Sequence, residues 1–347
     1  MTTPSGHLAL SVLDTAPVWQ DGGPGESLRT AVDLAKRVED QGYLRYWIAE
    51  HHNTPSLATS SPSVIVGRLA AATSTLRLGS GGVMLPNHPP LVVAEQFATL
   101  AAFHPDRIDL GVGRAPGTDA VTAQALRRSS DPLSGTDFPE QFGQLRRYLS
   151  ADAGERGGIV AVPAGGQSVP VFLLGSSPSS AALAGSLGVP FAFAHHLRPD
   201  STEASVQAYR SAFRPSRELA EPYVIVAALV IAAETDDLAQ HYSTSMKVAF
   251  VRGMAENAPF RPPSAAERVT LSQSDELLVQ RQFGPQIIGG PKTLHEGVES
   301  LVERTGADEL MALTVIHDHE ARVRSYQLLS EAAEKIDTRG RNRTMQI

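Results

Sequence analysis

Short apolar runs alternate along the chain with longer stretches whose apolar side chains recur at helical spacing. Runs of the first kind predict buried strands, and stretches of the second kind predict amphipathic helices. The predicted strands cover residues 7–14, 44–49, 76–80, 107–113, 169–174, 190–194, 222–232 and 309–316. Strands that alternate with helices form parallel β/α units. Because no linker divides the chain, the pattern predicts an α/β fold of the TIM (β/α)8 barrel type; the alternative is an open doubly wound sheet of two halves.

Two segments interrupt this alternation. Residues 128–168, after the fourth predicted strand, are dominated by Ser, Asp, Pro and Gly, apart from a stretch at 140–149 that predicts a helix. Residues 252–285, after the seventh predicted strand, are also irregular. Barrels carry their function in the loops at the C-terminal ends of the strands. We therefore predict one domain over residues 1–347, with both insertions at the barrel mouth.

Composition and charge narrow the class of protein. The chain is 42% hydrophobic and 19% charged, which is typical of a soluble globular protein. Its net charge of −7 argues against nucleic-acid binding, which usually needs a basic face. It contains no cysteine, which excludes a disulfide, a thiolate metal site and a cysteine nucleophile. No apolar run approaches the ~20 residues of a membrane helix and the first residues lack the pattern of a signal peptide, so we predict a cytoplasmic protein without a membrane partner.

Polar groups that suit an anion follow two of the predicted strands. Residues 175–180, Gly-Ser-Ser-Pro-Ser-Ser, come directly after an apolar run and open a helix, where free N–H groups and serine hydroxyls favour a phosphate. The alternative is a helix cap without a ligand. Arg114 lies just past the fourth strand and could pair with the same phosphate, or form a surface salt bridge instead. The glycines at 111–117 do not match a dinucleotide fingerprint, because the spacing is one residue too long and Pro116 interrupts it.

Histidines and glycines end the second and third predicted strands. His51 and His52 follow Glu50. Because neighbours on a strand point to opposite faces, only one of the two histidines needs to face the site. No companion carboxylate pattern supports a metal site, so we predict none and favour a hydrogen-bonding or acid–base histidine, with a structural histidine as the alternative. Gly81-Gly82 predicts a flat ligand against the backbone, or else a tight turn.

These residues together resemble the bacterial luciferase-like flavin monooxygenases, in particular their single-chain branch. The resemblance covers nearly the whole chain, and its motifs are 50–52 (EHH), 79–86 (GSGGVMLP), 106–114 (DRIDLGVGR), 175–180 (GSSPSS), 287–291 (IIGGP) and 308–311 (DELM). It implies a TIM barrel that binds reduced FMN at its mouth. It also implies a separate flavin reductase as partner, and related barrels often form homodimers.

The resemblance assigns roles by position. Arg114, Ser176 and Ser179 would hold the flavin phosphate, beside Gly175. The Gly81–Gly82 peptide, usually cis in this family, would lie against the isoalloxazine ring. His51 matches the catalytic histidine of the family.

Two departures from the family pattern argue against light emission. In light-emitting luciferase a cysteine precedes the phosphate-binding arginine, and here that position is Gly113; a glutamate near the phosphate loop is likewise replaced by Gly175. We therefore expect a two-component FMN monooxygenase that oxidises a small organic substrate with O2. The substrate pocket is expected near four histidines, His52, His88, His195 and His196. The alternatives are a deazaflavin-dependent dehydrogenase and a flavin-binding protein without catalysis.

Overall fold

The computed structural model describes residues 8–115, 117–127, 137–150, 158–163 and 168–336, and within them all named strands join one nine-stranded parallel sheet. The strands are β1 (Ala9–Asp14), β2 (Arg45–Ile48), β3 (Arg77–Met84), β4 (Ile108–Gly113), β5 (Val171–Gly175), β6 (Phe191–Ala194), β7 (Val224–Ala232), β8 (Ile287–Gly289) and β9 (Glu309–Leu313). The helices are α1 (Pro24–Asp40), α2 (Pro62–Ala70), α3 (Pro90–Phe103), α4 (Ala120–Arg127), α5 (Phe138–Leu149), α6 (Pro178–Ser186), α7 (Thr202–Ala212), α8 (Asp236–Glu256), α9 (Pro263–Ala266), α10 (Gln273–Phe283), α11 (Pro291–Thr305) and α12 (His319–Ala333).

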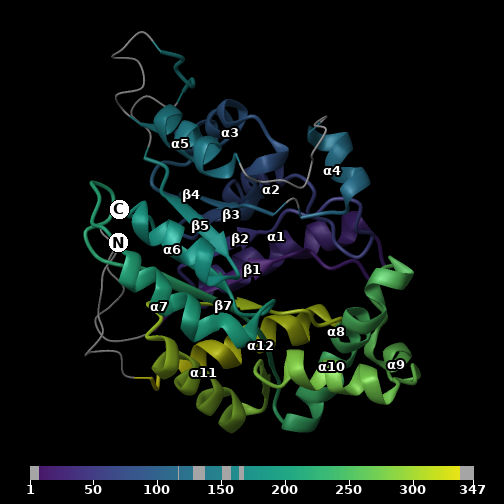
Figure 1. The fold of residues 1–347 in the computed structure, drawn as a ribbon. Helices are drawn as coiled ribbons and strands as arrows, with labels where there is room; N and C mark the ends of the chain where they lie inside the picture. Colours follow the sequence, from purple (N-terminus) through teal and green to yellow (C-terminus); the bar gives the residue numbers. More distant parts are fainter. Residues whose placement is uncertain (1–7, 116, 128–136, 151–157, 164–167, 337–347) are drawn as a thin grey trace.

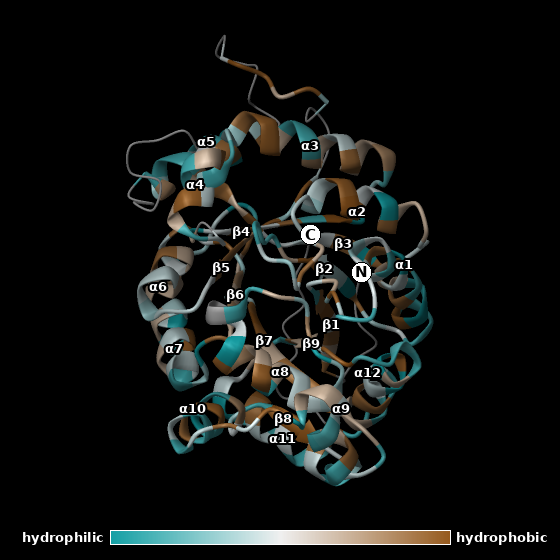
Figure 2. Ribbon diagram, turned by 90° about the vertical axis from the view of Figure 1, so that its right-hand side faces the viewer, coloured by the Kyte–Doolittle hydropathy of each residue, from teal (hydrophilic) through white to brown (hydrophobic). Residues whose placement is uncertain are grey.

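Eight of the strands close into a barrel. Strands β1 to β6 pair in chain order, β6 pairs with β7, β7 with β9, and β9 returns to β1. Strand β8 adds to the last three residues of β7. Helices surround the strands on the outside (Figure 1, Figure 2). The predicted TIM (β/α)8 barrel is therefore confirmed, with β1–β7 and β9 as its eight strands.

Strand β3 is longer than the sequence predicts, and strand β8 is additional to the predicted strands. The glycine pair Gly81-Gly82 lies inside β3, not after it, and the register with β4 shifts between Gly81 and Val83. Glycine lowers strand propensity, so the apolar pattern ends before the strand does. Strand β8 was not predicted, because three residues are too short to show a periodicity.

Proline marks the start of many helices. Pro24, Pro62, Pro90, Pro178 and Pro291 each occupy the first helical position. A proline there has a suitable φ and lacks an N–H that would have no intrahelical partner. These starts follow the C-terminal ends of the strands, so local sequence directs each chain segment out of the barrel mouth and back along its outer wall.

The two predicted insertions differ in how much of them is described. Within 128–168, α5 buries Phe138, Phe142 and Leu145 and lies beside α3 (Figure 2), whereas residues 128–136, 151–157 and 164–167 lie outside the described residues. Residues 252–285 contain the end of α8 together with α9 and α10. No helix in the described part of the chain combines the length and the apolar character needed to cross a membrane.

Charged residues fill the barrel at the N-terminal ends of its strands. Arg45 Nη1 lies 2.6 Å from Asp109 Oδ2, and Arg45 Nε lies 2.8 Å from Glu309 Oε1. Arg77 Nη2 contacts the other oxygen of Asp109 at 2.5 Å. Burial would raise the pKa of Asp109, but the two guanidinium groups lower it, so the carboxylate stays ionised. Trp47 Nε1 donates to Asp109 Oδ2 at 3.1 Å, and Trp47 also lines the cavity. It therefore separates this charged layer from a cavity at the C-terminal ends of the strands.

Candidate functional site

A cavity of about 560 Å³ lies at the C-terminal ends of the strands. Its walls come from strand residues or the residues that follow them: Leu13, Thr15, Trp47, Ala49, His51, Gly81, Met84, Gly113, Arg114, Leu174, Gly175, Ala192, Ala194, His196, Ala227, Leu229, Met311, Leu313 and Val315. Helix α8 covers it with Met246, Ala249 and Phe250, and the segment 252–285 adds Phe260 and Phe283. Most of these side chains are apolar, so the cavity suits a large ligand that is itself mostly apolar.

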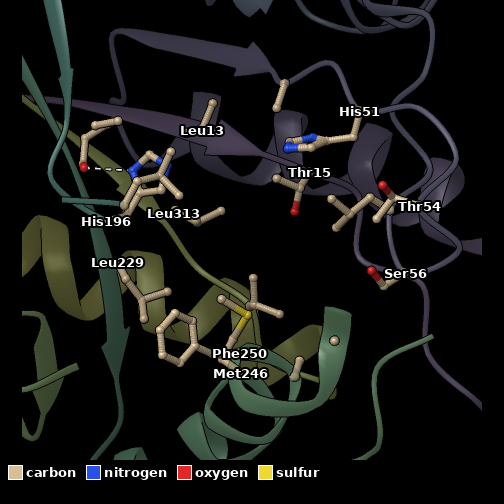
Figure 3. Close-up of a pocket in the computed structure, with 18 of the residues that line it drawn as sticks. Leu13, Thr15, His51, Thr54, Ser56, His196, Leu229, Met246, Phe250 and Leu313 are labelled. Carbon is tan, nitrogen blue, oxygen red and sulfur yellow. Dashed lines mark hydrogen bonds between the residues drawn. The ribbon is translucent and has the colours of Figure 1, made fainter. Parts of the chain in front are cut away.

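His51 lies in the wall of this cavity and has one ring nitrogen without a hydrogen-bond partner among the described residues. It follows β2, and its backbone N–H is held by Thr59 O at 3.0 Å. Its ring points into the cavity (Figure 3), and its Nδ1 is buried without a hydrogen-bond partner among the described residues. Burial lowers the pKa of His51, so the ring is neutral near pH 7. A neutral imidazole with an unpaired nitrogen is ready to exchange a hydrogen bond or a proton with a ligand.

His196 faces the same cavity from the opposite wall (Figure 3). Its Nδ1 lies 2.9 Å from Ala227 O. A carbonyl only accepts hydrogen bonds, so Nδ1 carries the proton of the neutral ring and Nε2 is an acceptor. Burial lowers the pKa of His196 to about 4, which keeps the ring neutral at physiological pH.

Glu50 holds two further histidines away from the cavity wall. Its Oε1 lies 2.8 Å from His52 Nε2 and 2.8 Å from His88 Nε2, while its Oε2 accepts from Met84 N at 3.1 Å. The sequence pattern does not reveal this cluster, because His88 lies far along the chain from Glu50. The three side chains are close enough to share a cation, but each nitrogen is already a donor to the carboxylate.

Of the four histidines predicted near the substrate, His196 is the one in the cavity lining. His52 and His88 point to Glu50. His195 is buried, with Nδ1 at 2.7 Å from Thr202 Oγ1 and Nε2 at 3.2 Å from Pro285 O. The alternation of side-chain direction along a strand does not predict these hydrogen-bond partners, because they lie beyond the strand end.

The predicted phosphate residues gather at one side of the cavity. Arg114, Gly175 and Ser176 line it, and Arg114 is exposed and makes no hydrogen bond or ion pair with another described residue. Ser179 is outside the lining and contacts the Ser177 hydroxyl at 3.0 Å. Ser177, which the sequence analysis did not single out, lines the cavity and caps α6 by accepting from Ser180 N at 3.4 Å.

The glycines at the site are enforced by close packing. A Cβ on Gly81 would lie 2.6 Å from Leu13 Cδ1, and one on Gly82 would lie 2.7 Å from Gly111 O. Gly81 lines the cavity, Gly82 does not, and the peptide bond between them is cis, as the resemblance implied. A Cβ on Gly175 would lie 2.1 Å from Ser180 Oγ, so this glycine allows α6 to approach β5.

Comparisons with known proteins agree across nearly the whole chain. The family model described as luciferase-like monooxygenase matches residues 8–309. Protein YvbT of Bacillus subtilis (strain 168) is 46% identical over 325 residues, covering 93% of this chain and 96% of that protein. A luciferase-like monooxygenase of Escherichia coli (strain K12) is 43% identical over 333 residues, covering 95% and 98%. The crystal structure of apo-MsnO8 superposes with a TM-score of 0.89 at 37% identity, covering 94% of this chain and 99% of that one.

More distant structures share the barrel but differ in cofactor. The oxygenating constituent of 3,6-diketocamphane monooxygenase from Pseudomonas putida, in complex with FMN, has a TM-score of 0.69 at 18% identity and covers 95% of this chain and 99% of that one. A coenzyme F420-dependent tetrahydromethanopterin reductase from Methanopyrus kandleri has a TM-score of 0.66 at 17% identity and covers 94% and 99%. The fold is thus common to FMN and F420 proteins, so the choice of cofactor depends on local residues.

Proposed function

Because the chain belongs to the luciferase-like monooxygenase family, we propose that it is a two-component FMN-dependent monooxygenase. It would take reduced FMN from a separate flavin reductase and use O2 to oxidise a small organic substrate. The observation that carries this proposal is one largely apolar cavity lined by Arg114 and His51, where no other described residue pairs with the Arg114 guanidinium or with His51 Nδ1.

The phosphate of FMN would be held by Arg114, Ser176 and Ser177. Arg114 offers a guanidinium that no other described residue engages, and guanidinium forms charge-assisted hydrogen bonds with phosphate. The two serines lie at the N-terminus of α6, where backbone N–H groups and the helix dipole favour an anion. Ser179 would act through its contact with Ser177, as a positioning residue.

The flavin ring would lie against the side-chain-free backbone at Gly81. Bound reduced flavin supplies the electrons that activate O2, and the protein supplies binding, orientation and shelter from water. His51 would hold a proton or a hydrogen bond at the reacting centre, because its ring points into the cavity. The apolar walls formed by Leu174, Met311 and Leu313 would exclude water from that centre.

Three further expectations stay predictions: a homodimer, a cytoplasmic location and the flavin reductase partner. Light scattering on the purified protein tests the first. Replacing one flavin reductase by another tests the last. Turnover should depend on reduced FMN and should continue with any flavin reductase that supplies it by diffusion.

An anaerobic titration of the purified protein with reduced FMN tests the proposed function. We expect saturable binding, followed after admission of air by oxygenated product when a suitable substrate is present. Binding of reduced coenzyme F420 but not of reduced FMN would identify a deazaflavin dehydrogenase instead. Binding of FMN without turnover of any substrate in a broad panel would identify a carrier.

A further inference from the structure

We propose that the half of the cavity beneath α8 is the substrate subsite, and that it selects uncharged apolar molecules carrying one hydrogen-bond donor, a hydroxyl or an N–H, which His196 Nε2 accepts. This proposal rests on the proposed function, because it assigns the other half of the cavity, beside Arg114 and Ser176, to the flavin.

The walls of this half are apolar. Leu229 and Leu313 come from neighbouring strands β7 and β9, and Met246 and Phe250 descend from α8 one turn apart (Figure 3). Burial of apolar surface contributes roughly 25 cal/mol per Å², so an apolar ligand body is stabilised here. A ligand with a buried charge is not, unless the protein supplies a counter-charge.

The charged residues near this half are already paired. Arg252 Nη2 lies 3.4 Å from Asp275 Oδ2 and 3.2 Å from Thr270 O. Arg261 Nη1 lies 2.7 Å from Glu256 Oε2. These internal pairs tie α8 to the segment that follows it and leave neither guanidinium as an open site for an anionic substrate.

His196 has one fixed orientation. Its Nδ1–H donates to Ala227 O, on the β7 strand that forms the same wall, and its backbone carbonyl accepts from Gln282 Nε2 at 2.7 Å. The other ring nitrogen lies on the side that faces the cavity (Figure 3). An acceptor held in this way recognises a donor on the ligand, and a ligand without a donor would leave Nε2 buried and unpaired.

Two further polar side chains of the lining, Gln286 and Ser245, bear on this test. Gln286 accepts from Leu229 N at 3.0 Å and donates to His195 O at 3.3 Å. Ser245 lines the same cavity, and its Oγ is buried without a hydrogen-bond partner among the described residues. Removing the Ser245 hydroxyl therefore tests whether any polar atom in the wall would give the same selectivity.

A matched pair of fluorescent probes tests the proposal on the full-length protein without turnover. 2-Naphthol and 2-methoxynaphthalene have the same apolar body, but only the first has a donor. Fluorescence titration should give an affinity for 2-naphthol about 3- to 10-fold higher than for the ether, the factor that one neutral hydrogen bond supplies. Equal affinities would overturn the proposal.

Three variants decide whether His196 is the acceptor. His196→Asn keeps a donor near Ala227 O but removes the atom at Nε2, and should abolish the preference for 2-naphthol. His196→Gln places an amide oxygen at about the reach of Nε2 and should retain part of it. Ser245→Ala should retain all of it; a preference lost in Ser245→Ala, or kept in His196→Asn, would overturn the assignment. Reduced-FMN affinity, measured separately, should be unchanged in all three, so a failure of the subsite is distinguished from a failure of the proposed function.

Discussion

Glu50 Oε1 lies 2.8 Å from His52 Nε2, which joins the two residues on either side of His51. A carboxylate that accepts from His52 and from His88 in the next loop fixes the path of the chain between them. Burial would raise the pKa of Glu50, but the hydrogen bonds from these two histidines lower it to about 2, so the side chain remains an acceptor. The orientation of His51 in the cavity therefore depends on a residue that does not itself line the cavity.

Replacing Glu50 by glutamine should destabilise the protein and weaken the site. An amide cannot accept hydrogen bonds from both histidines and from the Met84 N–H as strongly as the carboxylate does. We therefore expect a loss of about 1–3 kcal/mol in the free energy of unfolding. Urea denaturation at pH 7 measures it. Glu299→Gln, on the exposed face of α11, is the control and should change stability little.

The stability difference between the natural protein and Glu50→Gln should depend on pH. The pKa of Glu50 is lowered from 4.5 to about 2 in the folded protein, so its stabilising contribution is complete above pH 4.5 and is lost as the pH falls toward 2. The difference in unfolding free energy between the natural protein and Glu50→Gln should shrink over that range. A difference that stays constant from pH 6 to pH 3 would contradict an ionised Glu50.

His51→Leu should separate stability from activity. The natural side chain leaves a buried nitrogen unpaired, so its removal should leave the unfolding free energy unchanged or raise it by up to about 1 kcal/mol. Substrate-dependent oxygen consumption should fall by about 10²-fold or more, the usual contribution of an acid–base group. A stable His51→Leu protein with full activity would remove His51 from the mechanism.

Arg114→Ala should weaken binding of reduced FMN by about 1.5–3 kcal/mol, the range for hydrogen bonds to charged groups. Anaerobic titration gives the dissociation constant. Arg37→Ala is the control, because Arg37 is an arginine in the last turn of α1 that does not line the cavity. If the two variants bind equally well, the phosphate lies elsewhere.

Asp109→Asn should destabilise the barrel strongly. It leaves Arg45 and Arg77 buried without the carboxylate that both contact, and breaking a buried ion pair costs about 3–5 kcal/mol. Chemical denaturation measures the loss. Glu320→Gln breaks the exposed pair with Arg37 and should cost less than about 1 kcal/mol.

The sequence predicted the barrel because the patterns that specify its strands and helices are local. Apolar runs, helical spacing and prolines at helix starts act over a few residues, and together they specify eight β/α units. The same rule placed Arg114 and Ser176 after parallel strands, which end at one edge of a sheet, and both residues line the cavity. The resemblance to the luciferase-like family is likewise confirmed, since its motifs are short and continuous in the chain.

Tertiary structure alone decided which polar side chains face the cavity. His51 and His196 line it whereas their neighbours His52 and His195 do not, because each neighbour has a polar partner outside the cavity lining, Glu50 for His52 and Thr202 for His195. Such choices depend on the path of the loop beyond the strand end and on contacts between distant residues, and neither follows from a periodic pattern. The sequence by itself determined the barrel and the strand ends that surround the cavity, and packing determined the direction of the side chains there.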